Sequence, residues 1–467
     1  MFSPSRNAST ACGLATPALA LVLGVALARS AQCQEGTSTP PSMALRVTLA
    51  YDGTTLMAVR VEHLTKRAPP SASLAAAIGP ATCSFQLEDA NGEVLYRRIL
   101  PGVTPGETEA FPAAPGAPAI QRVPIPGRGK SLVIKLPELP TARDLVILGY
   151  CPDPHPGGTP GVPIPPVRLH LKDLHQLKPK IPKGRIESML PKVTKVVYHG
   201  ESCWDLVILS EGFEEKDLGK FATETWNFVQ QLWGVPPFAD VWSAINVYRI
   251  DVVSADTGAD DPAGAPGSGT GAAPSTAFDA KFCADGATHS LMDVDVPEVM
   301  AVASDRVPNW DMALVMVNSD LYGGGEWPEA SVGMFSLGAS PDGTPAWQTG
   351  MHEIGHAFLL GDEYGATGTW NAAFGEPTEK NITMNANPAT VKWAPYITLN
   401  PVPTVVCTSS AAISPYPPAT IGMFEGGARV KCGLFHSEWI CKMRHHGYPF
   451  CAVCRDAIKA ELATFLP

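Results

Sequence analysis

The stretch Met351-His-Glu-Ile-Gly-His-Ala-Phe-Leu-Leu-Gly-Asp362 carries the most informative pattern in this sequence. On an α-helix, His352 and His356 stand one turn apart on the same face, so both imidazole rings can reach one metal ion. Glu353 is rotated by about 100° from His352, which places its carboxylate beside such an ion. Apolar residues surround these three, which indicates a buried helix whose polar side chains need partners. The stretch therefore predicts a metal-binding helix at the centre of a folded domain.

Neutral imidazoles suit zinc, which in catalytic sites takes three protein ligands and leaves one position open. We therefore expect one catalytic Zn²⁺ ion on His352 and His356. Glu353 is expected to act as the general base that takes a proton from the zinc-bound water. A surface helix with two ordinary histidines is the alternative, and the apolar neighbours weigh against it.

Asp362 lies where the third metal ligand falls in the pattern H-E-x-x-H-x-x-G-x-x-H of the metzincin peptidases, with Asp in place of the last His. To reach the ion, the chain must leave the helix after His356 and turn back. Gly361 can provide that turn, whereas Leu359 stands at the position of the usual turn glycine. An aspartate that caps a helix or forms a salt bridge is the alternative.

Residues 43–152 predict β structure. Two segments with alternating apolar and polar residues, Ala44–Tyr51 and 56–62, flank Asp52-Gly53, which is typical of a β-hairpin. Further strands are expected at residues 83–87, 132–136 and 145–150. We expect a β-sandwich accessory domain here. Residues 153–187 are rich in Pro and Gly, which predicts a semi-rigid linker.

Residues 188–467 have the pattern of an α/β (α+β) domain and hold every residue assigned to chemistry. Buried strands are expected at 204–210, 245–253 and 312–318, and an amphipathic helix at 213–233. Because the expected linker separates this domain from the β-rich region, a chain that starts near Ser188 is expected to fold, bind zinc and cleave a small peptide.

Residues 1–31 resemble a signal peptide, with Arg6 before an apolar run at 15–28 and small residues after it. A membrane anchor is the alternative, but the run is shorter than the roughly 20 apolar residues that cross a bilayer. We therefore expect a secreted protein, extracellular or periplasmic, with no integral membrane segment after signal removal. The net charge of −11, without basic clusters, argues against nucleic acid as a partner.

The chain has 11 cysteines, and Cys12 lies in the expected signal peptide. An oxidising compartment favours disulfides among the others. Cys451-Ala-Val-Cys454 can join Cys441 in a structural zinc site, but the expected export favours disulfides for these three residues as well.

Several separated blocks resemble the M64 peptidases, the IgA-peptidase family of metallopeptidases. These blocks are residues 204–213, 318–324, 352–364, 381–383 with 392–393, 424–427, 441–444 and 450–454. The resemblance implies a metzincin-like zinc peptidase fold after an accessory domain. It implies three zinc ligands, His352, His356 and Asp362, and the base role for Glu353. It also implies that Met443 is the methionine of the turn beneath the metal.

These features favour a zinc metallopeptidase, a hydrolase that acts as an endopeptidase on a protein or peptide substrate. A cell-surface adhesin or binding module with a relic metal site is the alternative from another class. The intact Glu353 argues against it, because a structural metal needs no base beside its ligands. A metal hydrolase that acts on other amides or esters is a third possibility.

Overall fold

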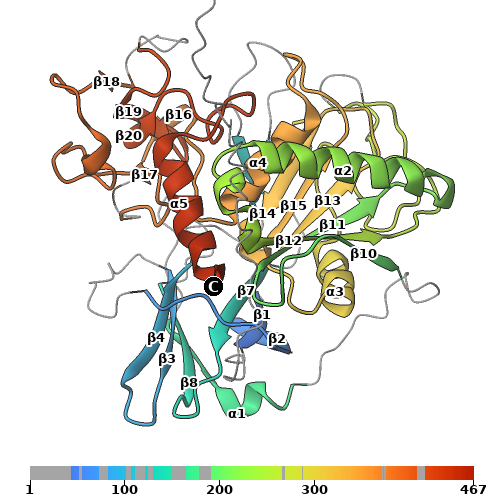
Figure 1. Ribbon diagram of the computed structural model, residues 1–467, viewed down its shortest axis with the longest axis horizontal. Helices are drawn as coiled ribbons and strands as arrows, with labels where there is room; N and C mark the ends of the chain where they lie inside the picture. Colours follow the sequence, from blue (N-terminus) through green and yellow to red (C-terminus); the bar gives the residue numbers. More distant parts are fainter. Residues whose placement is uncertain are drawn as a thin grey trace, which may run out of the picture.

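A computed structural model describes residues 44–466, except 52–54, 73–82, 101–106, 111–120, 125–129, 150–164, 178–190, 266–268, 285, 287, 371, 373–374 and 408–415. The expected signal peptide, residues 1–31, lies outside the described residues. The described residues form several sheets with helices packed on them, so the expected mixed α/β architecture is confirmed in outline (Figure 1). No helix among them is long and apolar enough to cross a bilayer.

The N-terminal region contains two sheets around one apolar core. One sheet has the order β2-β1-β7, and the other has the order β4-β3-β8-β9. Their elements are β1 (Ala44–Tyr51), β2 (Leu56–Leu64), β3 (Ser84–Glu88), β4 (Val94–Ile99), β7 (Lys130–Pro137), β8 (Asp144–Leu148) and β9 (Val167–His170). A hairpin of β5 (Glu107–Ala110) and β6 (Gln121–Pro124) is separate from both sheets.

The N-terminal unit extends into the range expected to be a linker. Strand β9 pairs antiparallel with β8. The short helix α1 (Leu171–Leu174) follows, and Leu171 and Leu174 are both buried in the same apolar core. The paired segment is only a few residues long, so the Pro-rich composition of this range did not indicate a strand. The N-terminal unit thus reaches at least residue 174.

A six-stranded sheet forms the centre of the catalytic region, in the order β10-β12-β11-β13-β15-β14. Its elements are β10 (Lys192–Val197), β11 (Trp204–Glu211), β12 (Ile245–Asp251), β13 (Met312–Val317), β14 (Gly324–Trp327) and β15 (Val332–Ser336). The four inner strands are parallel to one another, whereas each edge strand is antiparallel to the strand beside it. Strands buried on both faces read as continuous apolar runs, which is why 204–210 and 312–318 were identifiable.

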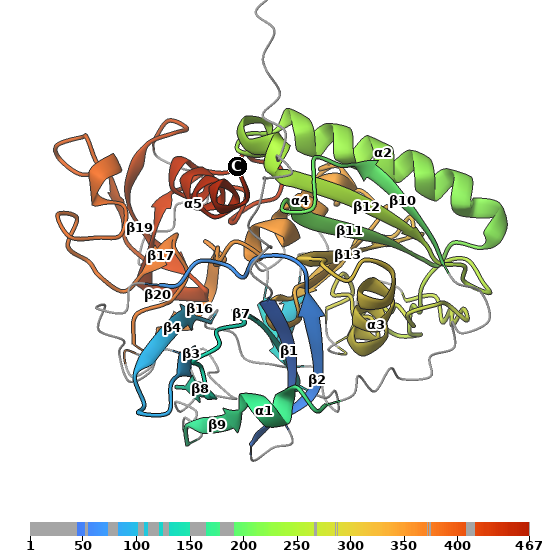
Figure 2. The same cartoon turned by 60° about the horizontal axis from the view of Figure 1, so that its bottom comes forward.

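Alternate side chains of the sheet enter two different cores. Leu206 and Ile208 of β11 belong to the core with α2 (Leu218–Gly234) and α4 (Ala346–His356). Val207 and Leu209 point to the other face, where α3 (Val296–Arg306) packs. Figures 1 and 2 show α2 and α4 side by side on one face of the sheet, with α3 on the other.

The C-terminal region adds a second sheet beside the end of α4. It contains β16 (Gly365–Thr369), β17 (Ile382–Thr383), β18 (Thr404–Val405), β19 (Ile421–Gly427) and β20 (Arg429–Glu438), and β20 contacts three of the others. Helix α5 (Ala452–Leu462) follows and packs in the same core as α2 and α4. Short 3-10 helices span Glu215–Asp217, Phe238–Ala244, Pro328–Ala330, Ala394–Tyr396 and Ala463–Phe465. Helix α2 therefore begins later than the periodicity predicted, after the first of these turns.

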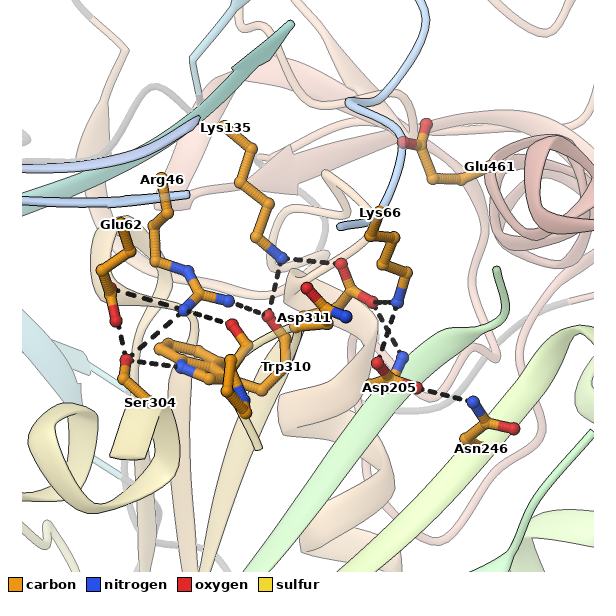
Figure 3. A network of polar contacts seen from close by, with 12 residues as sticks. Arg46, Glu62, Lys66, Lys135, Asp205, Asn246, Ser304, Trp310, Asp311 and Glu461 are labelled. Carbon is orange, nitrogen blue, oxygen red and sulfur yellow. Dashed lines mark hydrogen bonds and ion pairs between the residues drawn. The ribbon is translucent and has the colours of Figure 1, made fainter. Parts of the chain in front are cut away.

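The N-terminal unit is joined to the catalytic region by buried cations. Lys66 and Lys135 both form ion pairs with Asp311, and Lys66 also lies 3.1 Å from Asp205 (Figure 3). Arg46 is fully buried and lies over the ring of Trp310, with 4.4 Å between its guanidinium carbon and the ring centroid. The expected separation of the two domains by a linker therefore coexists with a close polar interface between them.

Candidate active site

Two glycines of α4 allow this helix to pack closely on both sides. A side-chain carbon at Gly350 would lie 2.9 Å from the rings of Phe228 and Phe335, which pack on the sheet. A side-chain carbon at Gly355 would lie 2.6 Å from the sulfur of Met443. Any larger residue at either position would push the helix away from its neighbour. The helix is therefore buried, as its apolar pattern predicted, and the polar motif residues lie inside the protein.

The three predicted metal ligands converge. The Nε2 atoms of His352 and His356 are 3.2 Å apart, and Asp362 Oδ1 lies 3.6 Å and 3.5 Å from them, respectively. Zinc–ligand bonds of about 2.0–2.2 Å in a tetrahedron place neighbouring ligand atoms about 3.3–3.5 Å apart. The side chains of all three residues are buried. The triangle thus has the size that one zinc ion requires.

The other nitrogen of each histidine is held by a backbone carbonyl. His352 Nδ1 lies 3.1 Å from the carbonyl oxygen of Lys442, and His356 Nδ1 lies 2.8 Å from that of Leu360. A carbonyl can only accept, so each Nδ1 carries the proton and donates it. Each Nε2 then keeps its lone pair and faces the triangle. This is the arrangement that metal-binding histidines generally show, and the donor set therefore fits a metal ion.

The chain returns to the site through a left-handed residue, and this residue is Leu359 rather than Gly361. Leu359 has φ of +58°, and its amide donates to the carbonyl of His356. The expectation that Gly361 makes the turn was wrong. Gly361 is instead required by packing, because a side-chain carbon there would lie 2.8 Å from Ile382. The side-chain amide of Asn381 holds Gly361 by accepting from its N–H and donating to its carbonyl, each over 2.7 Å.

Glu353 lies beside the triangle, not in it. Its side chain is fully buried, and a carboxylate oxygen lies within 4.8 Å of ligand-type atoms of His356 and Glu326. Glu326 comes from the edge strand β14, and one of its oxygens lies 3.9 Å from His356 Nδ1. Glu326 could not be predicted from the sequence, because its neighbours have no motif spacing. The position of Glu353 allows proton transfer next to the metal ligands.

Met443 packs against helix α4 at Gly355. It is fully buried, and its sulfur is the atom closest to the missing side chain of Gly355. Its carbonyl oxygen accepts the amide hydrogen of Glu363 over 2.8 Å. Tight turns follow, in which the amides of Arg444 and His445 both donate to the carbonyl of Cys441. The structure thus places Met443 against α4 at Gly355.

Two further polar residues border the site. The ring of His446 lies 4.5 Å from that of His352, centroid to centroid, and its Nδ1 lies 3.3 Å from the hydroxyl of Tyr322 and 3.2 Å from that of Thr349. Burial raises the pKa of the Tyr322 hydroxyl, which keeps it protonated as a donor. In contrast, His445 and Tyr448 are exposed. Tyr322 and His446 come from segments that are 124 positions apart in the sequence.

The cysteines follow the disulfide expectation in part. Cys407 and Cys432 form a disulfide, and Cys203 is also disulfide-bonded. However, Cys441, Cys451 and Cys454 remain thiols. The expectation of disulfides was therefore wrong for these three. All three are buried and close together, so export alone was a poor guide to their chemistry.

Comparison with known families agrees with this geometry. The family model described as IgA Peptidase M64 matches residues 196–411. This region of the chain is therefore similar to the M64 peptidases. The match includes His352, Glu353, His356 and Asp362, and it ends before Met443 and the three thiols. The match points to a peptidase, and a peptidase would act on protein or peptide substrates. No curated protein matches the chain.

Proposed function

We propose that this M64 protein is a secreted, zinc-dependent endopeptidase in which His352, His356 and Asp362 hold the ion and Glu353 is the general base. One observation carries the proposal. Three ligand atoms form a triangle with edges of 3.2–3.6 Å, and both histidines have their outer nitrogens fixed by carbonyls. An adhesin with a relic site would not need Glu353 buried next to this triangle.

The proposed reaction is hydrolysis of a peptide bond. Zinc, when bound, would supply Lewis-acid activation of water and of the scissile carbonyl. Glu353 accepts one proton from the attacking water while the water oxygen bonds to the carbonyl carbon. Glu353 then delivers this proton to the leaving nitrogen as the carbon–nitrogen bond breaks. The carboxylate ends in its starting state, ready for a second turnover.

Residues beside the triangle would orient the two imidazole rings and stabilise negative charge on the substrate oxygen. The carbonyls of Lys442 and Leu360 keep the two imidazole rings from rotating, so their Nε2 atoms stay aimed at one point. Tyr322 and His446 lie together beside His352 and offer hydrogen-bond donors near the position where negative charge develops on the substrate oxygen. We propose that they bind this oxygen in the transition state.

The surrounding structure supports a metzincin-like catalytic domain. Its features are the helix α4, the antiparallel edge strand β14 beside it and the methionine under the metal site. The two N-terminal sheets support a β-sandwich accessory domain.

The proposal can be tested with purified protein, a mixed protein substrate and mass spectrometry of the new N-termini. Wild type should release peptides, and a zinc chelator should stop the reaction until zinc is added back. Glu353→Gln should be inactive with its metal content unchanged. Glu224→Gln, a similar change at a partly exposed position of α2, is the matched control and should keep full activity. Near wild-type turnover by Glu353→Gln would refute the assigned mechanism.

A further inference from the structure

A second buried cluster of ligand-type residues lies behind the active site. It consists of Glu363, Cys441, Cys451 and Cys454, whose carboxylate oxygen and three sulfurs all lie within 4.8 Å of one another. Each of the four residues is almost completely buried. We propose that this cluster binds a second, structural zinc ion, separate from the catalytic one.

The distances within the cluster match a tetrahedral site. The sulfurs of Cys441 and Cys454 are 3.7 Å apart. Glu363 Oε1 lies 3.3 Å from the sulfur of Cys454 and 3.9 Å from that of Cys451. Zinc–sulfur bonds of about 2.3 Å and zinc–oxygen bonds of about 2.1 Å predict separations of about 3.8 Å for two sulfurs and about 3.6 Å for sulfur and oxygen. Thiolates select zinc over magnesium or calcium.

Disulfide formation does not account for the cluster. The separation of 3.7 Å between Cys441 and Cys454 is far from the bond length of about 2.05 Å in a disulfide. Three cysteines can form at most one disulfide among themselves, which leaves one buried thiol beside the Glu363 carboxylate. A metal ion uses all three sulfurs and the carboxylate at once. The four-ligand set, closed to solvent, is typical of structural zinc rather than catalytic zinc.

Backbone hydrogen bonds already point at the sulfurs. The amide of Cys451 donates to the sulfur of Cys441, and the amide of Cys454 donates to the sulfur of Cys451, each over 3.4 Å. Cys451 is the N-cap of α5, where the helix dipole favours negative charge. Asn381 donates to Glu363 Oε1 over 2.9 Å, which fixes the oxygen that faces the cysteines. All these groups stabilise the anionic form that a metal ligand needs.

Two cations balance the charge of such a site. Three thiolates and one carboxylate around a divalent ion leave a net charge of about −2. Lys442 and Arg444 flank Cys441 in the chain, and each interacts electrostatically with it. Lys442 is buried, and its ammonium group donates to the carbonyl of His446 over 2.7 Å. The surroundings thus suit a negatively charged metal site.

The cluster is connected to the catalytic ligands through the backbone. Glu363 directly follows Asp362, and its amide donates to Met443. Cys441 directly precedes Lys442, whose carbonyl orients His352. A zinc ion in the cluster would join these two segments to the start of α5. Its role would be to hold Asp362 and His352 in position, which makes it a positioning site rather than a part of the reaction.

The test is zinc stoichiometry of the full chain, purified with its thiols reduced and without chelator. Elemental analysis should find two zinc ions per wild-type chain. It should find one in the variant His352→Ala/His356→Ala and one in Cys451→Ser/Cys454→Ser. Cys407→Ser/Cys432→Ser is the matched control, because these sulfurs form a disulfide outside the cluster. It should keep two.

Cobalt gives a second readout that does not depend on the folding of the cysteine variant. Cobalt bound to thiolates has charge-transfer absorption in the near ultraviolet, which nitrogen and oxygen ligands do not produce. The variant His352→Ala/His356→Ala should keep this absorption when loaded with cobalt. Its absence, or the loss of all zinc from this variant, would overturn the second site. If this variant kept both zinc ions, the catalytic assignment would fail instead, and the two proposals are thereby tested separately.

Discussion

Asp311→Asn is expected to weaken the attachment of the N-terminal unit to the catalytic region. The Asp311 carboxylate accepts from three donors at the interface (Figure 3). Its Oδ1 lies 2.6 Å from the ammonium of Lys135, and its Oδ2 pairs with Lys66 and accepts the amide hydrogen of Asp205 over 2.8 Å. Asparagine has nearly the same shape but no charge. The variant therefore leaves two buried cations without their shared anion.

The size of the destabilisation depends on the partners that Lys66 and Lys135 keep in the variant. Removing one partner of a buried ion pair costs roughly 3–5 kcal/mol. Lys66 keeps Asp205, 3.1 Å away, and Lys135 keeps the carbonyl of Trp310, 2.9 Å away. The new amide can still accept from the Asp205 N–H. We therefore expect a loss near the lower end, about 3 kcal/mol in the free energy of unfolding.

The assay is urea unfolding with zinc present, followed by tryptophan fluorescence, to which the buried Trp310 contributes. The control is Asp240→Asn, which breaks the ion pair with Lys459. That pair spans 3.4 Å, and its side chains are 50% and 43% exposed, respectively. Exposed pairs contribute less than about 1 kcal/mol. A double-variant cycle with Lys135→Met isolates the pair energy, and the double variant should recover part of the loss.

Equal losses for Asp311→Asn and Asp240→Asn would refute the reasoning. The result would mean that water reaches the interface and screens the charges, so that the N-terminal unit is held by something else. A loss of zinc from Asp311→Asn would also count against it, because Asp311 is assigned to the interface and not to metal binding.

Four further predictions follow from the site and the interface. Glu353→Gln should lower kcat by about 10²–10⁴-fold while both zinc ions stay bound, measured by peptide cleavage and elemental analysis. Asp362→Ala should lose the catalytic zinc and keep the cysteine-bound one, so a stoichiometry that stays at two would contradict its ligand role. Burial alone would raise the pKa of Asp311, but Lys135 and Lys66 outweigh it and lower the pKa to about 2. The stabilisation from a depressed pKa is complete above the unfolded pKa and is lost as the pH falls through the folded pKa, so the difference in melting temperature between wild type and Asp311→Asn should close as the pH falls from about 4 toward 2. A chain that starts near Ser188 should still bind zinc but melt at a lower temperature than the full chain; an equal melting temperature would show that the interface adds no stability.

The features that can be predicted from the sequence depend on residues that lie close together along the chain. His352, Glu353 and His356 are placed by helical geometry, and β1 has the bounds that alternation indicated. Asp362 is reached through a single turn, although Leu359 makes that turn at the cost of a left-handed conformation. Local spacing suffices for such features, because short-range backbone geometry decides them.

The features that the sequence did not predict depend on contacts between distant segments. Tyr322 and His446 meet across 124 positions, and Glu326 approaches His356 from an edge strand. The cations of the N-terminal unit could not be predicted as interface residues, because a lysine in an alternating strand normally faces solvent. The cysteine expectation failed for a different reason. It was based on the redox compartment, which determines whether disulfides can persist but not which sulfurs lie close enough to form them.

One short segment connects the predicted catalytic triangle with the proposed sulfur cluster. Cys441 enters the sulfur cluster, the carbonyl of the next residue orients His352, and Met443 lies under Gly355. On the facing segment, Asp362 enters the catalytic triangle while its neighbour Glu363 enters the sulfur cluster. Two adjacent residues on each segment therefore serve different ions. Because the backbone between them is short and buried, a shift at one cluster must displace ligands or their supports at the other. The catalytic zinc should for this reason be held less tightly wherever the sulfur cluster is lost.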